Sequence, residues 1–239
     1  MTTDDFIGVI DGSTSKTDSR ISGKERNGRY CMLLISDFLR RLPRETTVDE
    51  FCDGVTEVIR GHYSRESMDH LSAHPEDRMT ASVILYSRSR NEIWMIGDCQ
   101  GIINRRLLEN SKPEEKEIAG KRVSLILHGL SPEEARKAII PDLIKAMREG
   151  QNKTYAVIDG FPVYRKGIIV IPCPCSPDTQ LVLASDGYPF LRPTLEESEQ
   201  LLARQLEQDP QNLRTFLATK GLKAGNKSFD DRAYIRFRP

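Results

Sequence analysis

Apolar runs rich in β-branched residues occur in two groups, which flank a helical middle segment of the chain. The first group predicts a strand at residues 6–10 and a meander of three antiparallel strands at 80–86, 92–96 and 101–105. The second group predicts strands at residues 154–158, 167–171, 180–184 and 233–237. Because each group of strands must bury a face, the pattern indicates two antiparallel sheets packed together, with helices on their outer faces.

Apolar residues at helical spacing predict the helices that cover these sheets. They fall at residues 29–42, 48–62, 114–127, 195–207 and 211–222. A further helix is expected to begin with Ser131 as its N-cap and Pro132 in its first position, and Pro141 is expected to kink it. The predicted fold class is therefore α+β, a four-layer αββα sandwich.

The composition excludes several broad classes of protein. No internal repeat, low-complexity tract or linker divides the 239 residues, so we expect one domain over residues 1–239. Lysine plus arginine and aspartate plus glutamate each number 35, so no basic surplus indicates a nucleic-acid partner. The start MTTDDF is acidic, which argues against a signal peptide. No apolar stretch approaches the ~18 residues of a membrane span, so no membrane partner is expected.

The cysteines indicate a reduced, cytoplasmic protein. Their number is five, which is odd, and they do not form a disulfide framework. Cys173 and Cys175 are separated by one proline, but the sequence has no second pair at the spacing of zinc ligands. We therefore interpret these thiols as buried or loop cysteines.

Carboxylates stand at the ends of the predicted strands in four places. Asp11 ends the run FIGVID, Asp98 follows EIWMIG, and Asp186 follows LVLAS. Asp230 and Asp231 precede the closing strand. A single Asp-Gly pair is weak evidence, because both residues are common in turns. Strand ends from two aligned sheets can, however, converge on one rim.

Convergent carboxylates repel one another and need a cation to be stable. The set offers hard oxygen ligands and no histidine, which indicates Mg²⁺ or Mn²⁺. Cys99 follows Asp98, but one thiol does not make a zinc site. Gly12 and Gly187 follow two of the carboxylates and allow backbone and water to approach closely.

The order of these motifs resembles the metal-dependent Ser/Thr protein phosphatases of the type 2C class. The matching segments are VIDG at residues 9–12, MTASVILY at 79–86, IWMIGD at 93–98, LVLASDG at 181–187 and FDDRAYIRF at 229–237. They extend over nearly the whole chain, and LVLASDG and the Gly-Asp strand end are the most specific. The resemblance implies a β-sandwich between two helical layers, in agreement with the pattern.

The resemblance also implies a site for two metal ions. Asp11 would bridge both ions, and Gly12 would offer its carbonyl oxygen to one of them. Asp186 and Asp230 would hold the other, with Asp231 as the alternative to Asp230.

A third, weaker ion would lie at Asp98 by the same resemblance. Asp11 and Asp186 are then the catalytic residues, because a water deprotonated by Mn²⁺ or Mg²⁺ attacks phosphorus in line. No protein nucleophile is needed for this chemistry.

Two features depart from the family pattern. Relatives carry an N-terminal strand with a phosphate-binding arginine and a metal-binding acid, whereas only MTTDD precedes Phe6 here. Asp4 or Asp5 is the candidate replacement for the acid. The second departure follows Asp-Gly, where Ser13–Ser15 replaces the usual His-Gly-Gly.

The same loop contains the candidates for the phosphate-binding cation, which are Lys16, Arg20 and Arg26. The stretch GSTSKT at residues 12–17 is not a P-loop, because that motif needs a glycine directly before the lysine.

The sequence therefore predicts a metal-dependent phosphatase that hydrolyses phosphomonoesters, with a phospho-Ser or phospho-Thr protein as substrate. Two alternatives stay open. The altered loop is also compatible with a catalytically inactive module that keeps the fold for regulation or binding. A small-molecule phosphatase is the other alternative, because the loops that shape a substrate pocket are hard to predict.

Overall fold

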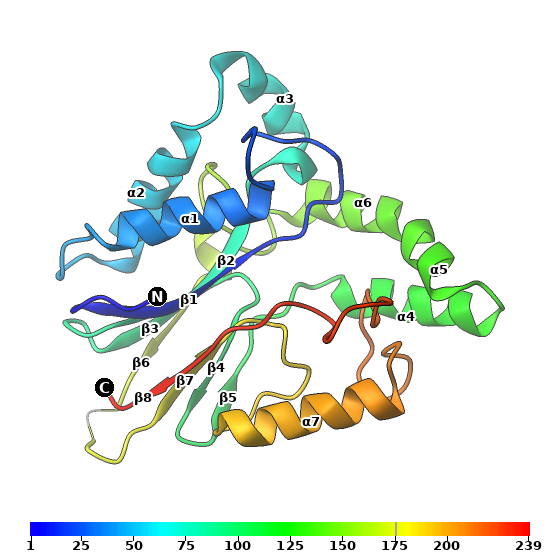
Figure 1. Ribbon diagram of the computed structural model, residues 1–239. Coiled ribbons are helices and arrows are strands. Elements are labelled where there is room, and N and C mark those ends of the chain that lie inside the picture. Colours follow the sequence, from blue (N-terminus) through cyan, green and yellow to red (C-terminus); the bar gives the residue numbers. More distant parts are fainter. Residues whose placement is uncertain (175) are drawn as a thin grey trace.

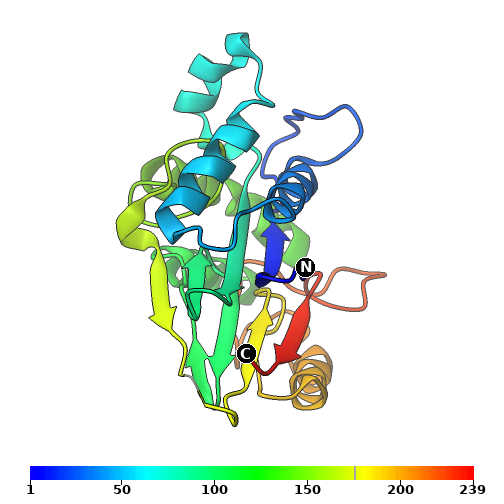
Figure 2. The same cartoon turned by 90° about the vertical axis from the view of Figure 1, so that its left-hand side faces the viewer.

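The computed structural model describes residues 1–174 and 176–239, and it contains two antiparallel sheets (Figure 1). The first consists of β1 (Phe6–Gly12), β2 (Ala81–Ser87), β3 (Glu92–Ile96) and β6 (Ile169–Pro172), in that order. The second consists of β5 (Arg106–Leu108), β4 (Gln100–Ile103), β7 (Leu181–Ala184) and β8 (Tyr234–Phe237), in that order. β1 contacts β7 and β8, so the two sheets meet along these strands (Figure 2).

The alternation of side chains along the strands builds the layers. Ile7 and Val9 of β1 and Leu183 of β7 belong to one buried cluster, which lies between the sheets. Phe6 of β1 and Val83 of β2 point the other way and belong to a second cluster, which lies under the helices. Apolar residues on both faces of β1 and β2 explain why a helical layer must cover the first sheet.

Helices cover the outer faces of both sheets. Over the first sheet lie α1 (Asn27–Leu39) and α2 (Val48–Arg60), and below the second lies α7 (Leu195–Gln208) (Figure 1). The α+β class with two sheets between helical layers is therefore confirmed. No helix in the described ranges, 1–174 and 176–239, is long and apolar enough to span a membrane.

A group of helices lies at one end of the two sheets (Figure 1). It consists of α4 (Glu115–Leu127), α5 (Pro132–Ala138) and α6 (Ile140–Gly150). Ser131 caps α5 through a capping box, as predicted. The expected kink at Pro141 is instead a break between α5 and α6, with the proline in the first turn of α6, where it leaves no hydrogen bond unmade. The remaining short helices are α3 (Met68–Ala73) and the 3₁₀ turns at Arg65–Ser67, Pro75–Asp77 and Arg165–Gly167.

Three further sequence predictions of secondary structure are wrong. The strand expected at residues 101–105 is β4, but it pairs with β5 and β7 in the second sheet, because Gly97 (φ 92°) turns the chain out of the first. Residues 154–158 make only isolated bridges, at Tyr155 and Ile158.

The predicted helix at 211–222 is a loop. Asn212 has a positive φ of 53°, and the carboxylate of Asp209 accepts the N–H groups of Leu213 and Arg214, each at 2.8 Å. These local bonds satisfy the donors that a helix would otherwise use.

The prediction of buried or loop cysteines is confirmed for four of the five. Cys31, Cys52, Cys99 and Cys173 are buried, and Cys175 lies outside the described residues.

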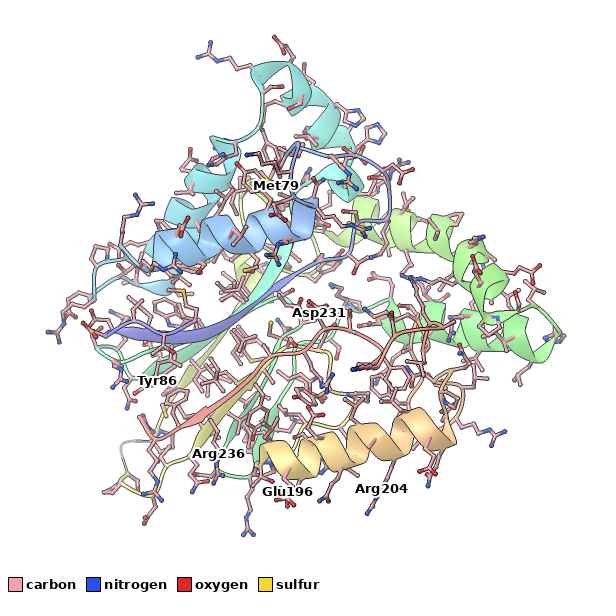
Figure 3. The ribbon with its side chains drawn as sticks, viewed as in Figure 1. Met79, Tyr86, Glu196, Arg204, Asp231 and Arg236 are labelled. Carbon is pink, nitrogen blue, oxygen red and sulfur yellow. The ribbon has the colours of Figure 1, made fainter. Side chains whose placement is uncertain are left out.

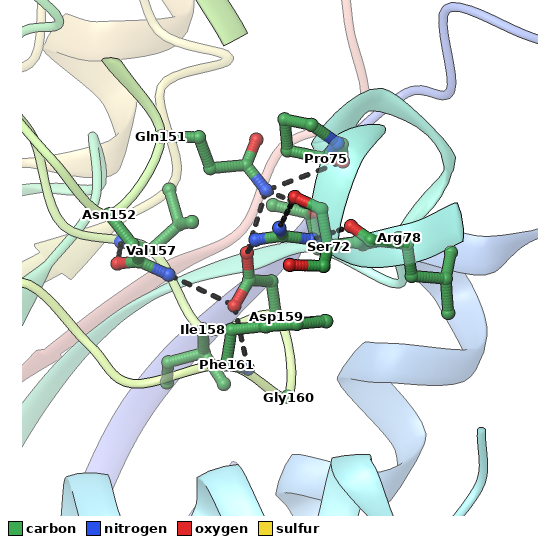
Figure 4. A network of polar contacts seen from close by, with 12 residues as sticks. Ser72, Pro75, Arg78, Gln151, Asn152, Val157, Ile158, Asp159, Gly160 and Phe161 are labelled. Atoms are coloured by element: carbon green, nitrogen blue, oxygen red, sulfur yellow. Dashed lines mark hydrogen bonds and ion pairs between the residues drawn. The ribbon is translucent and has the colours of Figure 1, made fainter. Parts of the chain in front are cut away.

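A buried ion pair fixes the segment after α6 to the first sheet (Figure 4). Arg78 and Asp159 lie 2.8 Å apart, and the side chain of Asp159 has 0% exposure. Gln151 and Asn152 also donate to this carboxylate, at 2.8 and 2.9 Å. Because every oxygen of the buried acid has donors, the Asp159-Gly160 pair has a structural role.

Candidate functional site

The sheet register brings the strand-end carboxylates to one end of the sandwich. Asp11 lies opposite Ser82 in the β1–β2 ladder, and the Ser82 hydroxyl donates to Asp98 at 2.6 Å. Asp98 lies two residues before Gln100, which pairs with Ala184 in the second sheet. Asp186 lies two residues after Ala184. The two sheets thus place Asp11, Asp98 and Asp186 around one point.

The segment before β8 completes this end. Ser185 donates its backbone N–H to the carbonyl of Ala233 at 3.1 Å, so Asp231 is held beside the turn at Asp186. A Cβ on Gly187 would lie 2.3 Å from the backbone oxygen of Asp231, so only glycine allows this approach. Figure 3 places Asp231 centrally, at the end of the sheets that faces α4.

A cavity of about 780 Å³ lies at this end, between the sheets and the helices α4–α6. We call the carboxylates that the strand ends place in its wall the acidic cluster. Its members are Asp11, Asp98, Asp186, Asp230 and Asp231.

Two members of the acidic cluster hold a proton more tightly than a free carboxyl group does. Burial, together with the negative charge of Asp186, raises the pKa of Asp11 to about 8. Burial and the charge of Asp98 also raise the pKa of Asp186. Because two buried carboxylates disfavour each other's charge, ionising both is costly when no cation lies between them.

Two other members are neutralised by lysines of the chain itself. Asp98 pairs with Lys112 from the segment before α4, and Asp230 pairs with Lys220. Burial alone would raise the pKa of Asp98, but the charge of Lys112 and hydrogen bonds from Lys112 and Ser82 outweigh it, so the pKa is lowered. Asp98 is therefore ionised, whereas Asp11 and Asp186 remain the pair that lacks a compensating charge.

The donors present have the chemistry of a Mg²⁺ or Mn²⁺ site. Asp11, Asp186 and Asp231 offer carboxylate oxygens, and Gly12 follows Asp11 directly with its backbone oxygen. A Cβ on Gly12 would lie 2.3 Å from the carbonyl of Gly28 in α1, so the backbone is tightly packed here. No group of three His, Cys, Asp or Glu side chains within residues 1–174 and 176–239 is already arranged as a metal cage. Binding would therefore require small side-chain shifts in the acidic cluster.

Positive side chains also line the cavity. Lys16 lines it, as the sequence suggested for a phosphate-binding cation, whereas Arg20 is exposed and is not among its lining residues. Arg26 is the N-cap residue of α1 and is also not among them. Asp4 and Asp5 lie at the other end of β1 from Asp11, since the backbone oxygen of Asp5 bonds Arg88 beyond the end of β2, so they do not reach the acidic cluster.

Sequence reasoning missed five cations that line the cavity, which are Lys112, Arg136, Lys220, Lys223 and Lys227. Each lies outside the strand motifs, and the contacts Lys112–Asp98 and Lys220–Asp230 join segments far apart along the chain. The spacing of residues along one sequence does not indicate contacts between such distant segments. The only available signal was the presence of lysine in otherwise polar loops, which is common on any surface.

Comparisons with known proteins give structural likeness only. No family model and no curated protein matches the sequence. A solved structure of the Mycobacterium tuberculosis serine/threonine phosphatase PstP is 16% identical over 87% of this chain and 82% of its own, with a TM-score of 0.41. The PstP catalytic domain in complex with two manganese ions is 16% identical over 87% and 76%, with a TM-score of 0.39.

A further similar structure is the PPM Ser-Thr phosphatase MsPP from Mycobacterium smegmatis, in complex with cacodylate. It is 15% identical, covers 99% of this chain and 98% of its own, and has a TM-score of 0.39. Identities and TM-scores this low do not establish a function, so the function must be argued from the site itself.

Proposed function

We propose that this protein is a metal-dependent phosphatase that hydrolyses phosphomonoesters, with a phospho-Ser or phospho-Thr protein as its substrate. The observation that carries the proposal is the meeting of Asp11, Asp98, Asp186, Asp230 and Asp231 in one cavity. Two of these carboxylates are paired with lysines, but Asp11 and Asp186 lie together without a cation of the chain and disfavour each other's charge. Their gathering is explained by a cation.

Asp11 and Asp186 would hold this cation, Mn²⁺ or Mg²⁺, with Asp231 or Asp230 and the Gly12 carbonyl as further ligands. A bound ion of this kind supplies a water of lowered pKa and neutralises charge on the phosphoryl oxygens. Because burial and the charge of Asp186 raise the pKa of Asp11 to about 8, cation binding is coupled to release of a proton from this carboxyl group. Lys16 lies on the cavity wall and supplies positive charge for the phosphate.

The rival proposal is a catalytically inactive binding module. It is favoured by the pairing of Asp98 with Lys112 and of Asp230 with Lys220, because the protein's own cations already neutralise two of the five carboxylates. A module of this kind would keep the fold and lose tight cation binding.

Hydrolysis of p-nitrophenyl phosphate by the purified chain, with Mn²⁺ and with EDTA, separates the two proposals when combined with calorimetric titration of Mn²⁺. Turnover that depends on Mn²⁺ is expected. Manganese binding without turnover would favour the module, and absence of both binding and turnover would overturn the phosphatase. Phosphopeptides and small phosphate esters, compared at equal concentration, then test the substrate class.

A further inference from the structure

Two partly buried cations line the cavity without an acidic partner among the described residues, whereas Lys223 and Lys227 of the same wall are exposed. Lys16 donates from its Nζ to the carbonyl of Thr14, and Arg136 of α5 donates from Nη1 to the carbonyl of Thr219 at 2.7 Å. Neither forms an ion pair with any described residue, in contrast to Lys112 and Lys220 of the same cavity. We call Lys16 and Arg136 the wall cations.

The wall cations are held in an unfavourable electrostatic environment. Burial, together with the positive charges of Arg136, Lys112 and Lys220, lowers the pKa of Lys16 to about 7. Burial also lowers the pKa of Arg136. Positive charges that are partly desolvated and face one another are costly unless an anion joins them.

A purely structural role does not account for Arg136. A guanidinium group has five N–H donors, and among the described residues Arg136 has one acceptor, the Thr219 carbonyl. That bond holds the side chain in place beside Lys220, which in turn pairs with Asp230 of the acidic cluster. The remaining donors of Arg136 have no acceptor among the described residues, and the side chain lines the cavity.

The neighbouring face of α6 is apolar. Leu143, Ala146 and Met147 of this helix, which follows α5 directly, line the same cavity and are half-buried. An anion held by Arg136 would therefore have apolar surface beside it. The cavity, at about 780 Å³, has room for more than a bare phosphate.

We propose that the wall cations form an anion-binding site for the phosphate dianion of a phosphate monoester, whose carbon-bearing part packs on Leu143 and Met147 of α6. Arg136 would bind the phosphate as the arginine of the N-terminal strand does in the family that the sequence resembles. It belongs to helix α5, and no sequence motif indicates it. The substrate class rests on the proposed function, whereas the anion site itself requires no metal and no turnover.

The test is calorimetric titration of the metal-free protein, in EDTA, with inorganic phosphate and then with phenyl phosphate. The wild-type protein is expected to bind both, and phenyl phosphate more tightly, because its ring meets α6. Arg136→Met and Lys16→Met are each expected to weaken phosphate binding about tenfold or more, since each removes charge-assisted hydrogen bonds. Arg136→Lys keeps the charge and is expected to restore part of the affinity.

Lys137→Met is the matched control. Lys137 neighbours Arg136 on α5, has a side chain 70% exposed, pairs with Glu133 and is not among the lining residues of the cavity. Its phosphate affinity is expected to equal that of the wild type, and unchanged circular dichroism shows that each variant is folded.

Absence of phosphate binding by the wild type, or full binding by Arg136→Met, would overturn the anion site. A protein that binds phosphate in EDTA but never hydrolyses an ester with Mn²⁺ would overturn the phosphatase and leave the anion site intact.

Discussion

The ammonium group of Lys112 lies 2.5 Å from Oδ2 of Asp98, at the end of the sandwich where the two sheets meet. Lys112 precedes α4 and Asp98 follows β3, so the pair ties the helical group to the sheets. It also means that a cation of the chain compensates one carboxylate of the acidic cluster. A divalent ion is then needed only where Asp11 and Asp186 face each other without a partner.

Replacing Lys112 with methionine should therefore make the protein depend on divalent cations for stability. The change leaves Asp98 with no opposite charge, and because the pair is only partly buried we expect a loss of about 1–3 kcal/mol in EDTA. An ion that binds Asp98 would restore part of this loss. Thermal unfolding with and without Mn²⁺ measures it, and the stabilisation by Mn²⁺ should be larger in the variant than in the wild type.

Lys121→Met provides the control for this prediction. Lys121 pairs with Asp142 at 2.7 Å, but its side chain is 53% exposed. Removal of this pair should cost at most about 1 kcal/mol and should not alter the effect of Mn²⁺. The prediction fails if Lys112→Met and Lys121→Met respond equally to the metal.

Arg78→Met should destabilise the fold far more than a change at a surface ion pair. It would leave the Asp159 carboxylate buried beside Gln151 with its charge uncompensated, at a cost of about 3–5 kcal/mol. The equivalent change at Arg40, whose pair with Asp37 is exposed, should cost about 1 kcal/mol or less. Urea unfolding of the two variants measures both, and similar losses would show that Asp159 does not depend on Arg78.

The Asp-Gly pairs show how far the sequence alone could go. Apolar runs and strand-end acids predicted the two sheets and named Asp11 and Asp186, because a buried strand and the turn that ends it are local signals. Four Asp-Gly pairs look alike in sequence, yet Asp11 and Asp186 line the cavity, Asp159 is held in a buried ion pair, and Asp53 is exposed on α2. Only the tertiary contacts separate them.

The loops and cations lay beyond that local signal. The apolar pattern at 211–222 suggested a helix, but Asp209 satisfies the backbone donors there in another way. Arg136 faces the cavity because α5 packs against the loop at Thr219, a contact between segments 83 residues apart. Contacts of that range depend on the whole fold and leave no mark in local spacing.

Asp186→Asn should abolish metal-dependent turnover and leave the fold intact. The amide keeps the size of the side chain and removes the negative charge that a cation needs, so hydrolysis of p-nitrophenyl phosphate with Mn²⁺ should fall by about 100-fold or more. Calorimetric titration should show weaker Mn²⁺ binding. Stability in EDTA should hold or rise, because repulsion of Asp11 by Asp186 is removed.

Asp53→Asn is the control for Asp186→Asn, because Asp53 is also followed by glycine but lies on α2, with a side chain 77% exposed and paired with Arg165. Its turnover and Mn²⁺ affinity should equal those of the wild type. Wild-type turnover in Asp186→Asn would refute the assignment of the acidic cluster as the reaction centre.

The raised pKa of Asp11 predicts how the stability of the metal-free protein depends on pH. In the unfolded chain an aspartate titrates near ~3.9, whereas burial and the charge of Asp186 raise the pKa of Asp11 to about 8 in the native state. Between these values the native state holds a proton that the unfolded state has released. The free energy of unfolding therefore falls as pH rises through this window, by up to about 1.4 kcal/mol per pH unit from this group, and levels off above it.

Asp11→Asn has no such proton to lose, so its stability should fall less than that of the wild type as the pH rises. Urea unfolding of both proteins in EDTA measures the difference. The measurements are made at about pH 5, 6 and 7.5, which lie between the pKa values of Asp11 in the unfolded and native states. Repeating the series with saturating Mn²⁺ should reverse the trend in the wild type alone, because the ion competes with the proton and binds better at higher pH. Parallel pH profiles for the two proteins in EDTA would show that Asp11 is not protonated in the native state.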